Sequence, residues 1–388
     1  MSTLKVDAIR HNSATSDAIT TASDGTCTAK LTSVNDGQLG NRRLNINGGF
    51  LVFQRSTSAA SVGASGEGYF APDRYRQSGT GNMRYTASRS ADVPAGYGFS
   101  YSLKYDCTTA SGTVSAGHFV ALEHRIEGQD LQVFCKGTAQ AKQYTISFHV
   151  KSPKTGIHVV ELYDNDNNRH VSKSYTISSA NTWQKITLTF PGDTTGAFGN
   201  DAGSSLRIFF WLMAGTSYTG VTLPSAWTAF SSTARATGQV NVFDNTSNDF
   251  YITGIQLEVG DTSTSFEHKR FSDELRDCQR YFQKSYNYDD AVGSSGVQGW
   301  FQWRRDGGNR PHIPMMTSMR ATPTFLAYNY TGGTSGQFRN ASNGTNHAQG
   351  SVNVIAQNIV SFDGGATGWN QIGTGEVGFM YYSLESEL

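Results

Sequence analysis

The sequence has few cysteines, few prolines and no surplus of charge of either sign. Its 388 residues include four cysteines, Cys27, Cys107, Cys135 and Cys278. They show no CxxC spacing, which argues against a zinc site and excludes a dense disulfide framework. We therefore expect free thiols in a protein folded in a reducing compartment, with a Cys107–Cys135 bridge as the alternative.

Charge and hydropathy exclude two further classes. The 31 basic residues balance the 31 acidic ones, so no overall field favours nucleic acid, and we expect no nucleic-acid partner. The opening MSTLKVDAIRHNS lacks the apolar core of a signal peptide, and no run approaches the ~18 apolar residues of a membrane span. We expect no membrane insertion, and assembly in the cytoplasm of the producing cell.

Aromatic and turn-forming residues are abundant instead. The chain has 22 Phe, 18 Tyr and 6 Trp beside 42 Gly, and 16% of its residues are charged. This composition is typical of a turn-rich all-β protein and not of a disordered chain. At this length the chain can form two or three domains, each with its own core.

Apolar and polar residues alternate repeatedly between residues 41 and 265. The clearest segments are 97–105, 144–150, 206–212 and 251–259. One-sided alternation gives each sheet one buried face, so two sheets should pack together. We predict a jelly-roll-type β-sandwich over 41–265, closed by the strand at 251–259, and a smaller C-terminal β domain over 287–388, where Gly-rich links separate shorter strands.

The polar segment 1–40 is poor in aromatics and could not bury enough surface to fold alone. We predict either a flexible tail or an arm that orders on a partner or in an oligomer.

The segment 266–286 changes from a period of two to a helical period. Ser272 is a suitable N-cap, and one face of the predicted helix carries Leu275, Cys278 and Phe282. We predict a linker helix whose apolar face packs on its own subunit or at a symmetry axis. Arg276 and Arg280 should then remain in solvent.

Catalytic and metal-binding motifs are missing. There is no GxSxG, no HExxH and no P-loop ending in GK[ST], and GASGEG (63–68) has no strand–loop–helix context. Asp164, Asp166 and Asn168 alternate as in a calcium loop, but the glycine and glutamate of such a loop are absent. We interpret 163–169 as a hairpin turn, although a structural calcium remains an alternative, and we expect no cofactor.

The acidic residues and histidines give no clear site either. Two pairs, Glu123 with Glu127 and Asp73 with Glu67, could be imagined as glycosidase carboxylates, but spacing alone does not establish the ~5–9 Å separation required. His118 and His124 lack a third metal ligand. We predict a protein that is not an enzyme.

Aromatic residues in loops are candidates for sugar binding, because saccharide rings present C–H faces that stack on aromatic rings. The candidates are Tyr218, Trp227, Trp300, Phe301 and Trp303. The alternative is that most of them are core or intersubunit residues. Trp183 and Trp211 fall inside strand patterns, and we expect them to be structural.

Several segments together resemble tail-fibre-like proteins of bacteriophages, including those of marine phages. They are STLKVDAI (2–9), NRRLNINGGFLVFQRS (41–56), YFAPDRYRQ (69–77), FYITGIQLEVGDTSTSFEHKRFSDELRDCQRYFQKSY (250–286), MRATPTF (319–325) and YYSLESEL (381–388). They cover most of the chain in the family's order.

The resemblance implies a virion protein with a sandwich similar to carbohydrate-binding modules. It implies a homotrimeric tail fibre or appendage subunit, attached to other virion proteins through its N-terminal arm and facing host-surface polysaccharide with its C-terminal part. The long attachment domain of many such fibres is missing. A head-decoration, neck or head-fibre protein with a purely structural role is therefore an alternative, and an envelope-polysaccharide depolymerase is a less favoured one.

Overall fold

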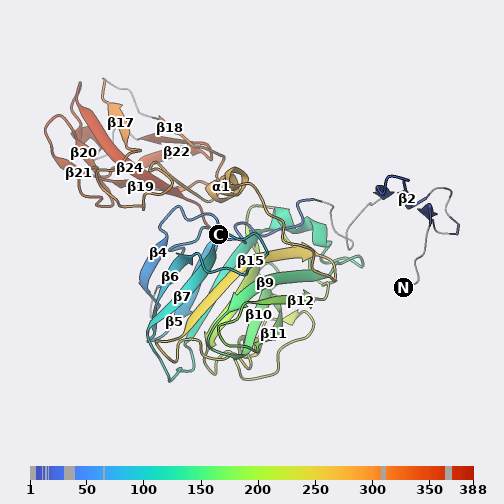
Figure 1. Ribbon diagram of the computed structural model, residues 1–388. Helices are drawn as coiled ribbons and strands as arrows, with labels where there is room; N and C mark the ends of the chain where they lie inside the picture. Colours follow the sequence, from blue (N-terminus) through green and yellow to red (C-terminus); the bar gives the residue numbers. More distant parts are fainter. Residues whose placement is uncertain are drawn as a thin grey trace.

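The computed structural model describes residues 6–10, 12–13, 15, 17–29, 40–63, 66–306, 312–362 and 369–388. A β-sandwich is followed by one short helix and a smaller β domain (Figure 1), which confirms the predicted all-β fold. The predicted arm falls partly outside the described residues. Its described part contains a separate three-stranded sheet of β1 (Ala8–Ile9), β2 (Ile19–Thr21) and β3 (Cys27–Ala29).

Two antiparallel six-stranded sheets form the sandwich, and all their strands lie between residues 41 and 265. The first sheet, in spatial order, is β14 (Thr228–Ala229), β11 (Arg169–Ile177), β10 (Gly156–Asp164), β13 (Ser204–Ala214), β8 (Phe119–Glu127) and β5 (Tyr75–Thr80). The second is β12 (Gln184–Phe190), β9 (Tyr144–Lys151), β15 (Asp249–Val259), β7 (Ser102–Thr109), β6 (Arg84–Ser90) and β4 (Ser58–Val62). Two short 3₁₀ helices, Gly128–Phe134 and Ser232–Ala234, connect strands.

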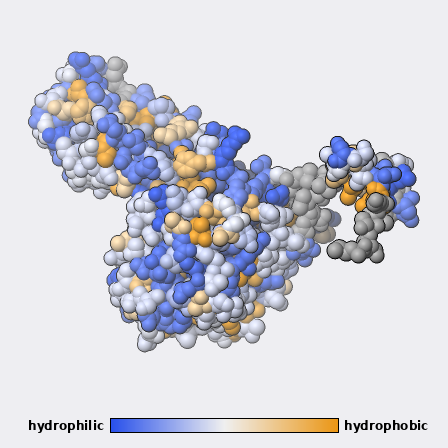
Figure 2. Space-filling model, in the orientation of Figure 1, coloured by the Kyte–Doolittle hydropathy of each residue, from blue (hydrophilic) through white to orange (hydrophobic). Residues whose placement is uncertain are grey.

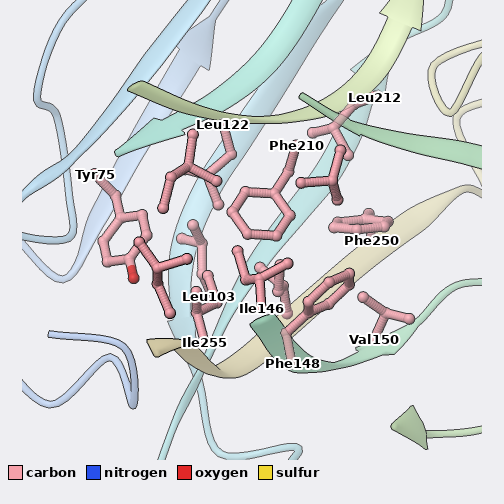
Figure 3. Packing of buried hydrophobic residues seen from close by; sticks show 14 of the residues in the cluster. Tyr75, Leu103, Leu122, Ile146, Phe148, Val150, Phe210, Leu212, Phe250 and Ile255 are labelled. Atoms are coloured by element: carbon pink, nitrogen blue, oxygen red, sulfur yellow. The ribbon is translucent and has the colours of Figure 1, made fainter. Parts of the chain in front are cut away.

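The inward-facing residues of both sheets form one continuous core. Figure 3 shows Phe210 and Leu122 of the first sheet facing Ile146 and Phe148 of the second. Phe148 contacts Phe210 edge to face, with ring centroids 5.1 Å apart, a preferred geometry for buried aromatic pairs. Period-two alternation therefore describes β9 and β13 correctly.

One detail of the sandwich differs from the prediction: β7 begins at Ser102, so 97–101 is not strand. The strand predicted at 251–259 is β15, which lies between β9 and β7 in the second sheet. Gly254 has a positive φ of 65° at a register shift in β15. The Phe99 ring lies over this glycine, and a Cβ there would be 2.4 Å from it.

The helix α1 (Phe271–Gln279) is shorter than predicted. Its N-cap is Arg270, without a side-chain cap, so the prediction for Ser272 is wrong. The buried residues of α1 are Glu274 and Cys278, whereas Leu275 is only partly buried. Phe282 is buried but belongs to the short strand β16 (Phe282–Lys284).

The C-terminal domain is built around its last strand. β24 (Val377–Glu385) pairs with β16, β17 (Phe301–Arg304), β19 (Thr324–Tyr328) and β20 (Gln337–Asn340), and β20 pairs with β21 (Asn346–Ala348). A second sheet contains β18 (His312–Pro314), β23 (Ile359–Phe362) and β22 (Val352–Ala356), and a 3₁₀ helix spans Trp369–Gln371. The core of this domain contains Trp303, Phe338, Phe362 and Trp369.

Charged contacts join the sandwich to the C-terminal domain. Arg280, at the end of α1, keeps 31% of its side chain exposed, as expected for a residue in solvent, but it also donates two hydrogen bonds of 2.7 Å to the buried Glu127. Arg74, which is buried in the sandwich, pairs with Glu387. In the orientation of Figure 2, apolar surface also gathers where the two domains meet. No helix in the described part of the chain is long and apolar enough to cross a membrane.

Candidate functional site on the outer face of the sandwich

The outer face of the first sheet buries two carboxylates, Glu123 on β8 and Glu161 on β10, each 0% exposed. Both occupy the polar phase of their strands, opposite to core residues such as Leu122 and Val160. A buried carboxylate requires charged or hydrogen-bonding partners. Neighbouring strands and loops supply these partners in both cases.

Glu123 is surrounded by three arginines from three adjacent strands. Its carboxylate accepts hydrogen bonds from Arg125 Nε at 2.7 Å, from Arg76 Nη1 at 3.2 Å and from Arg207 Nε. The Ser78 hydroxyl donates a further bond of 2.6 Å. Burial alone would raise the pKa of Glu123, but the guanidinium groups of Arg207 and Arg125 lower it to about 2, so the carboxylate is ionised at neutral pH.

Glu161 forms a second charged cluster on the same face. Arg235 Nε lies 3.0 and 2.9 Å from its two carboxylate oxygens, and Trp211 Nε1 donates at 3.2 Å. His170 Nδ1 lies 3.0 Å from Oε1. Glu161 thus fixes the position of Arg235 above the sheet.

A pocket of about 220 Å³ lies over this face. Its lining residues are Glu67, Arg76, Ser78, Phe119, Arg125, Tyr163, Arg207, Phe209, Phe230 and Arg235. Tyr163 and Phe230 are partly exposed and meet edge to face, with centroids 5.2 Å apart. The guanidinium of Arg207 lies 5.7 Å from the Tyr163 ring centroid, and that of Arg235 lies 5.3 Å from that of Phe230. The pocket thus combines aromatic rings with cations.

A second, larger cleft of about 790 Å³ lies between the sandwich and the C-terminal domain. Its walls carry many hydroxyl groups, including those of Ser58, Thr322 and Tyr328. Arg55 crosses the cleft floor, with its guanidinium 3.9 Å from the Phe282 ring centroid. Arg55 also pairs with Glu385 and Glu387 at 3.3 and 3.2 Å, so the charges of this cleft are largely satisfied by the two domains.

The predicted sugar-contact residues are dispersed. Tyr218 is partly buried on the outer face beside the pocket, 5.4 Å from Trp211. Trp227 is 8% exposed and donates Nε1 to the Pro191 carbonyl oxygen, while Trp303 is 7% exposed in the C-terminal core. Both indoles are buried, so neither offers a ring face to a sugar.

The other two predicted residues lie in the C-terminal domain. Trp300 and Phe301 are partly buried. The Trp300 ring packs on Tyr330 and the Phe301 ring on Trp303, with centroids 5.3 and 6.1 Å apart. They lie in a different domain from Tyr218, so the structure does not bring the five candidates together. Trp211 is fully buried, in agreement with its predicted structural role.

The imagined carboxylate pairs do not form glycosidase sites. Glu127 is four residues from Glu123 on the same strand, or about 13 Å at ~3.3 Å per residue, and it binds Arg280 and Tyr281. Asp73 is buried and accepts hydrogen bonds from Gln54. Glu67 pairs instead with Arg76 at 2.7 Å.

The segment 163–169 is the turn of the β10–β11 hairpin, which confirms its interpretation. The position of a calcium ion near Asp164 is taken by the buried Lys136, whose Nζ lies 2.6 Å from Asp164 and 3.1 Å from Asp193. Nζ also donates to the carbonyl oxygens of Thr195 and Gly196. Among the described residues, no group of three or more His, Cys, Asp or Glu could hold a metal ion.

The sequence analysis named Glu123 and Glu67 only as members of other carboxylate pairs, and it missed the remaining residues of the outer pocket. Glu161 and Tyr163 alternate along β10, and Glu123 and Arg125 along β8, each in the polar phase of an otherwise apolar strand. Charged residues at such positions within strongly apolar strands were the available indication that the outer face of the sheet is covered. A sheet face that is open to solvent would not carry so many apolar residues beside the charged ones.

Comparison with known proteins identifies no family. No family model and no curated protein matches the chain. Among solved structures, the enzymatically active domain of bacteriophage CBA120 tailspike protein 4 shares 14% identity over 56% of this chain, with a TM-score of 0.29. The match covers 21% of the tailspike chain, about a fifth of its length.

Two structures described as sugar-binding match this chain with TM-scores close to that of the tailspike domain. The family 11 carbohydrate-binding module of Clostridium thermocellum, in complex with a mixed-linked tetrasaccharide, is 11% identical over 49% of this chain and 91% of its own, with a TM-score of 0.26. A putative sugar-binding protein of Bacteroides thetaiotaomicron is 13% identical over 56% of this chain and 100% of its own, also at 0.26. At these scores the comparisons carry no conclusion about function.

Proposed function

We propose that this chain is a non-enzymatic structural protein of a phage particle, a homotrimeric tail-fibre or appendage subunit that binds host-surface glycan. The outer pocket of the sandwich supports the glycan-binding part of this proposal, because it places two partly exposed aromatic rings, Tyr163 and Phe230, beside hydrogen-bonding side chains. The phage particle and the trimer rest on the resemblance of the sequence to tail-fibre-like proteins. Its volume is below the ~300 Å³ of pockets for drug-sized ligands. It therefore suits one sugar unit of a longer glycan.

The state of the buried carboxylates supports binding rather than hydrolysis. A glycosidase requires one carboxyl group that stays protonated until it donates to the leaving group. Glu123, with its pKa lowered to about 2, is held as an anion by three arginines. Glu161 accepts hydrogen bonds from Arg235 and Trp211. Both carboxylates serve to position arginines.

The proposal is tested with purified full-length protein on an array of bacterial capsules and lipopolysaccharide O-chains. We expect binding to a subset of them and no release of reducing ends. Tyr163→Ala should weaken binding about tenfold, since aromatic contacts contribute ~1 kcal/mol or more. The matched control is Tyr251→Ala, which removes a partly exposed ring from the opposite sheet. No binding at all, or release of reducing ends, would overturn the proposal.

A purely structural role at the head or neck is the second candidate. In this role the larger cleft between the domains would bind no ligand, and Arg55, Glu385 and Glu387 satisfy one another there. Electron cryo-microscopy of the particle distinguishes the two. Density at the tail supports receptor binding, and density on the capsid supports the structural role.

A further inference from the structure

We infer that the outer pocket binds an acidic saccharide, one that carries a carboxylate or a sulfate group. The inference rests on the proposed function, since it names the chemical class of the glycan at the same site.

The lining has more positive than negative charges. Four arginines line the pocket, Arg76, Arg125, Arg207 and Arg235, against two glutamates, Glu67 and Glu123. This leaves a surplus of two positive charges, or of one when Glu161 behind Arg235 is included. The side chains of the four arginines are 13 to 24% exposed, so water screens their charge less than at an open surface.

Arg207 is the arginine with donors to spare. Among the hydrogen bonds of the described residues it uses only Nε, toward Glu123. Both of its Nη groups are therefore available, and it is the most exposed of the four, at 24%. A guanidinium fork of this kind matches the two oxygens of a carboxylate or sulfate.

The aromatic rings hold the Arg207 fork in place. Its guanidinium lies 5.0 Å from the Phe209 ring centroid and 5.7 Å from that of Tyr163. Because Nε is fixed by Glu123 and the plane is packed on rings, little side-chain freedom is lost when an anion binds. A neutral sugar could use the rings but would leave the surplus charge without a partner.

The experiment uses the same array, with each polysaccharide printed in its native form, after chemical reduction of its carboxyl groups and after desulfation. We expect binding to acidic polysaccharides that is lost on carboxyl reduction if the anion is a carboxylate, or on desulfation if it is a sulfate. Binding that survives both treatments would overturn the inference and leave the proposed function intact. No binding to any polysaccharide would overturn both.

Variants of Arg207 assign the effect to this pocket. Arg207→Gln should weaken binding to the acidic polysaccharides roughly 10- to 100-fold, as expected for a charged hydrogen bond of ~1.5–3 kcal/mol. Arg207→Lys keeps a cation beside Glu123 and should fold, but it lacks the fork and should still weaken binding. Lys185→Gln removes an exposed positive charge from the opposite sheet and serves as the control. Wild-type binding by both Arg207 variants would overturn the inference.

Discussion

Individual residues of this sandwich show how an all-β protein can bury charge. Lys136 has four oxygen partners within 3.1 Å, and Glu123 has three arginines. Such groups contribute little net stability, but removal of one partner leaves an uncompensated buried charge. They fix side chains in single positions, which is useful for Arg207 in a binding pocket.

Buried histidines differ from these charged groups, because burial favours their neutral form. His158 is 0% exposed and stacks on Tyr175 with centroids 5.4 Å apart. Burial lowers its pKa from 6.5 to about 4. Between these two values the unfolded chain binds more protons than the folded one, so stability should fall as the pH falls from about 6.5 to about 4.

We predict that His158→Gln makes stability less dependent on pH in this window. The full effect of a shift of this size is on the order of 3 kcal/mol. The measurement is the free energy of unfolding in urea at pH 7 and at pH 4.5. The exposed His312→Gln should retain the wild-type difference. The pKa of His149 is also lowered to about 4, by burial and by Lys185. His149 should therefore account for part of the pH dependence that remains in His158→Gln. An unchanged difference in His158→Gln would contradict the prediction.

At the scale of elements, α1 attaches to the sandwich through an ion pair and not through an apolar stripe. Glu274 is 2% exposed and pairs with Arg43, whose side chain is fully buried. Its other carboxylate oxygen accepts the backbone N–H of Asn47. The segment around 41–47 is thereby fixed against the helix.

Glu274→Gln should therefore destabilise the protein by roughly 3–5 kcal/mol, because the amide leaves the charge of Arg43 buried without a counter-ion. Denaturant unfolding measures the change. Asp273→Asn removes a carboxylate from the exposed first turn of the same helix and should have little effect. Equal stability of the two variants would show that the ion pair does not hold α1.

Elements were easier to predict than the site, for a physical reason. Residues 144–150 and 251–259 alternate because each strand has a core-facing side, so their strands could be recognised locally. The surroundings of Glu123 arise from strand pairing, which brings together Arg76 from 47 positions away and Arg207 from 84. The buried face of α1 was predicted incorrectly for the same reason. It carries Glu274, whose partner Arg43 lies 231 positions away in the sequence.

At the scale of the whole molecule, the C-terminal segment returns to the sandwich. Arg74 pairs with Glu387, and Arg125 donates to the Leu388 carbonyl oxygen. Arg320 donates to Ala202 at 3.0 Å. Because Arg125 also binds Glu123, the junction of the two domains and the outer pocket share a side chain. A mutation of Arg125 would therefore disturb both the junction and the pocket.

The last prediction concerns assembly. α1 presents Phe271, 45% exposed, and Leu275 one turn later, and Met316, 64% exposed, contacts Gln279 at the end of the helix. Exposed apolar side chains grouped in this way are typical of an interface. If this stripe forms the trimer contact, the wild-type protein should have about three times the 42.1 kDa mass of one chain.

Leu275→Asp should then dissociate the trimer into monomers, because three buried carboxylates would meet at or near one axis. Light scattering coupled to size-exclusion chromatography gives the mass. Arg276→Asp places the same acidic group on the neighbouring exposed side of the helix and should remain trimeric. A monomeric wild-type protein would refute the trimer itself. If Leu275→Asp remained trimeric, the trimer contact would lie outside α1. The helix would then serve only to join the two domains.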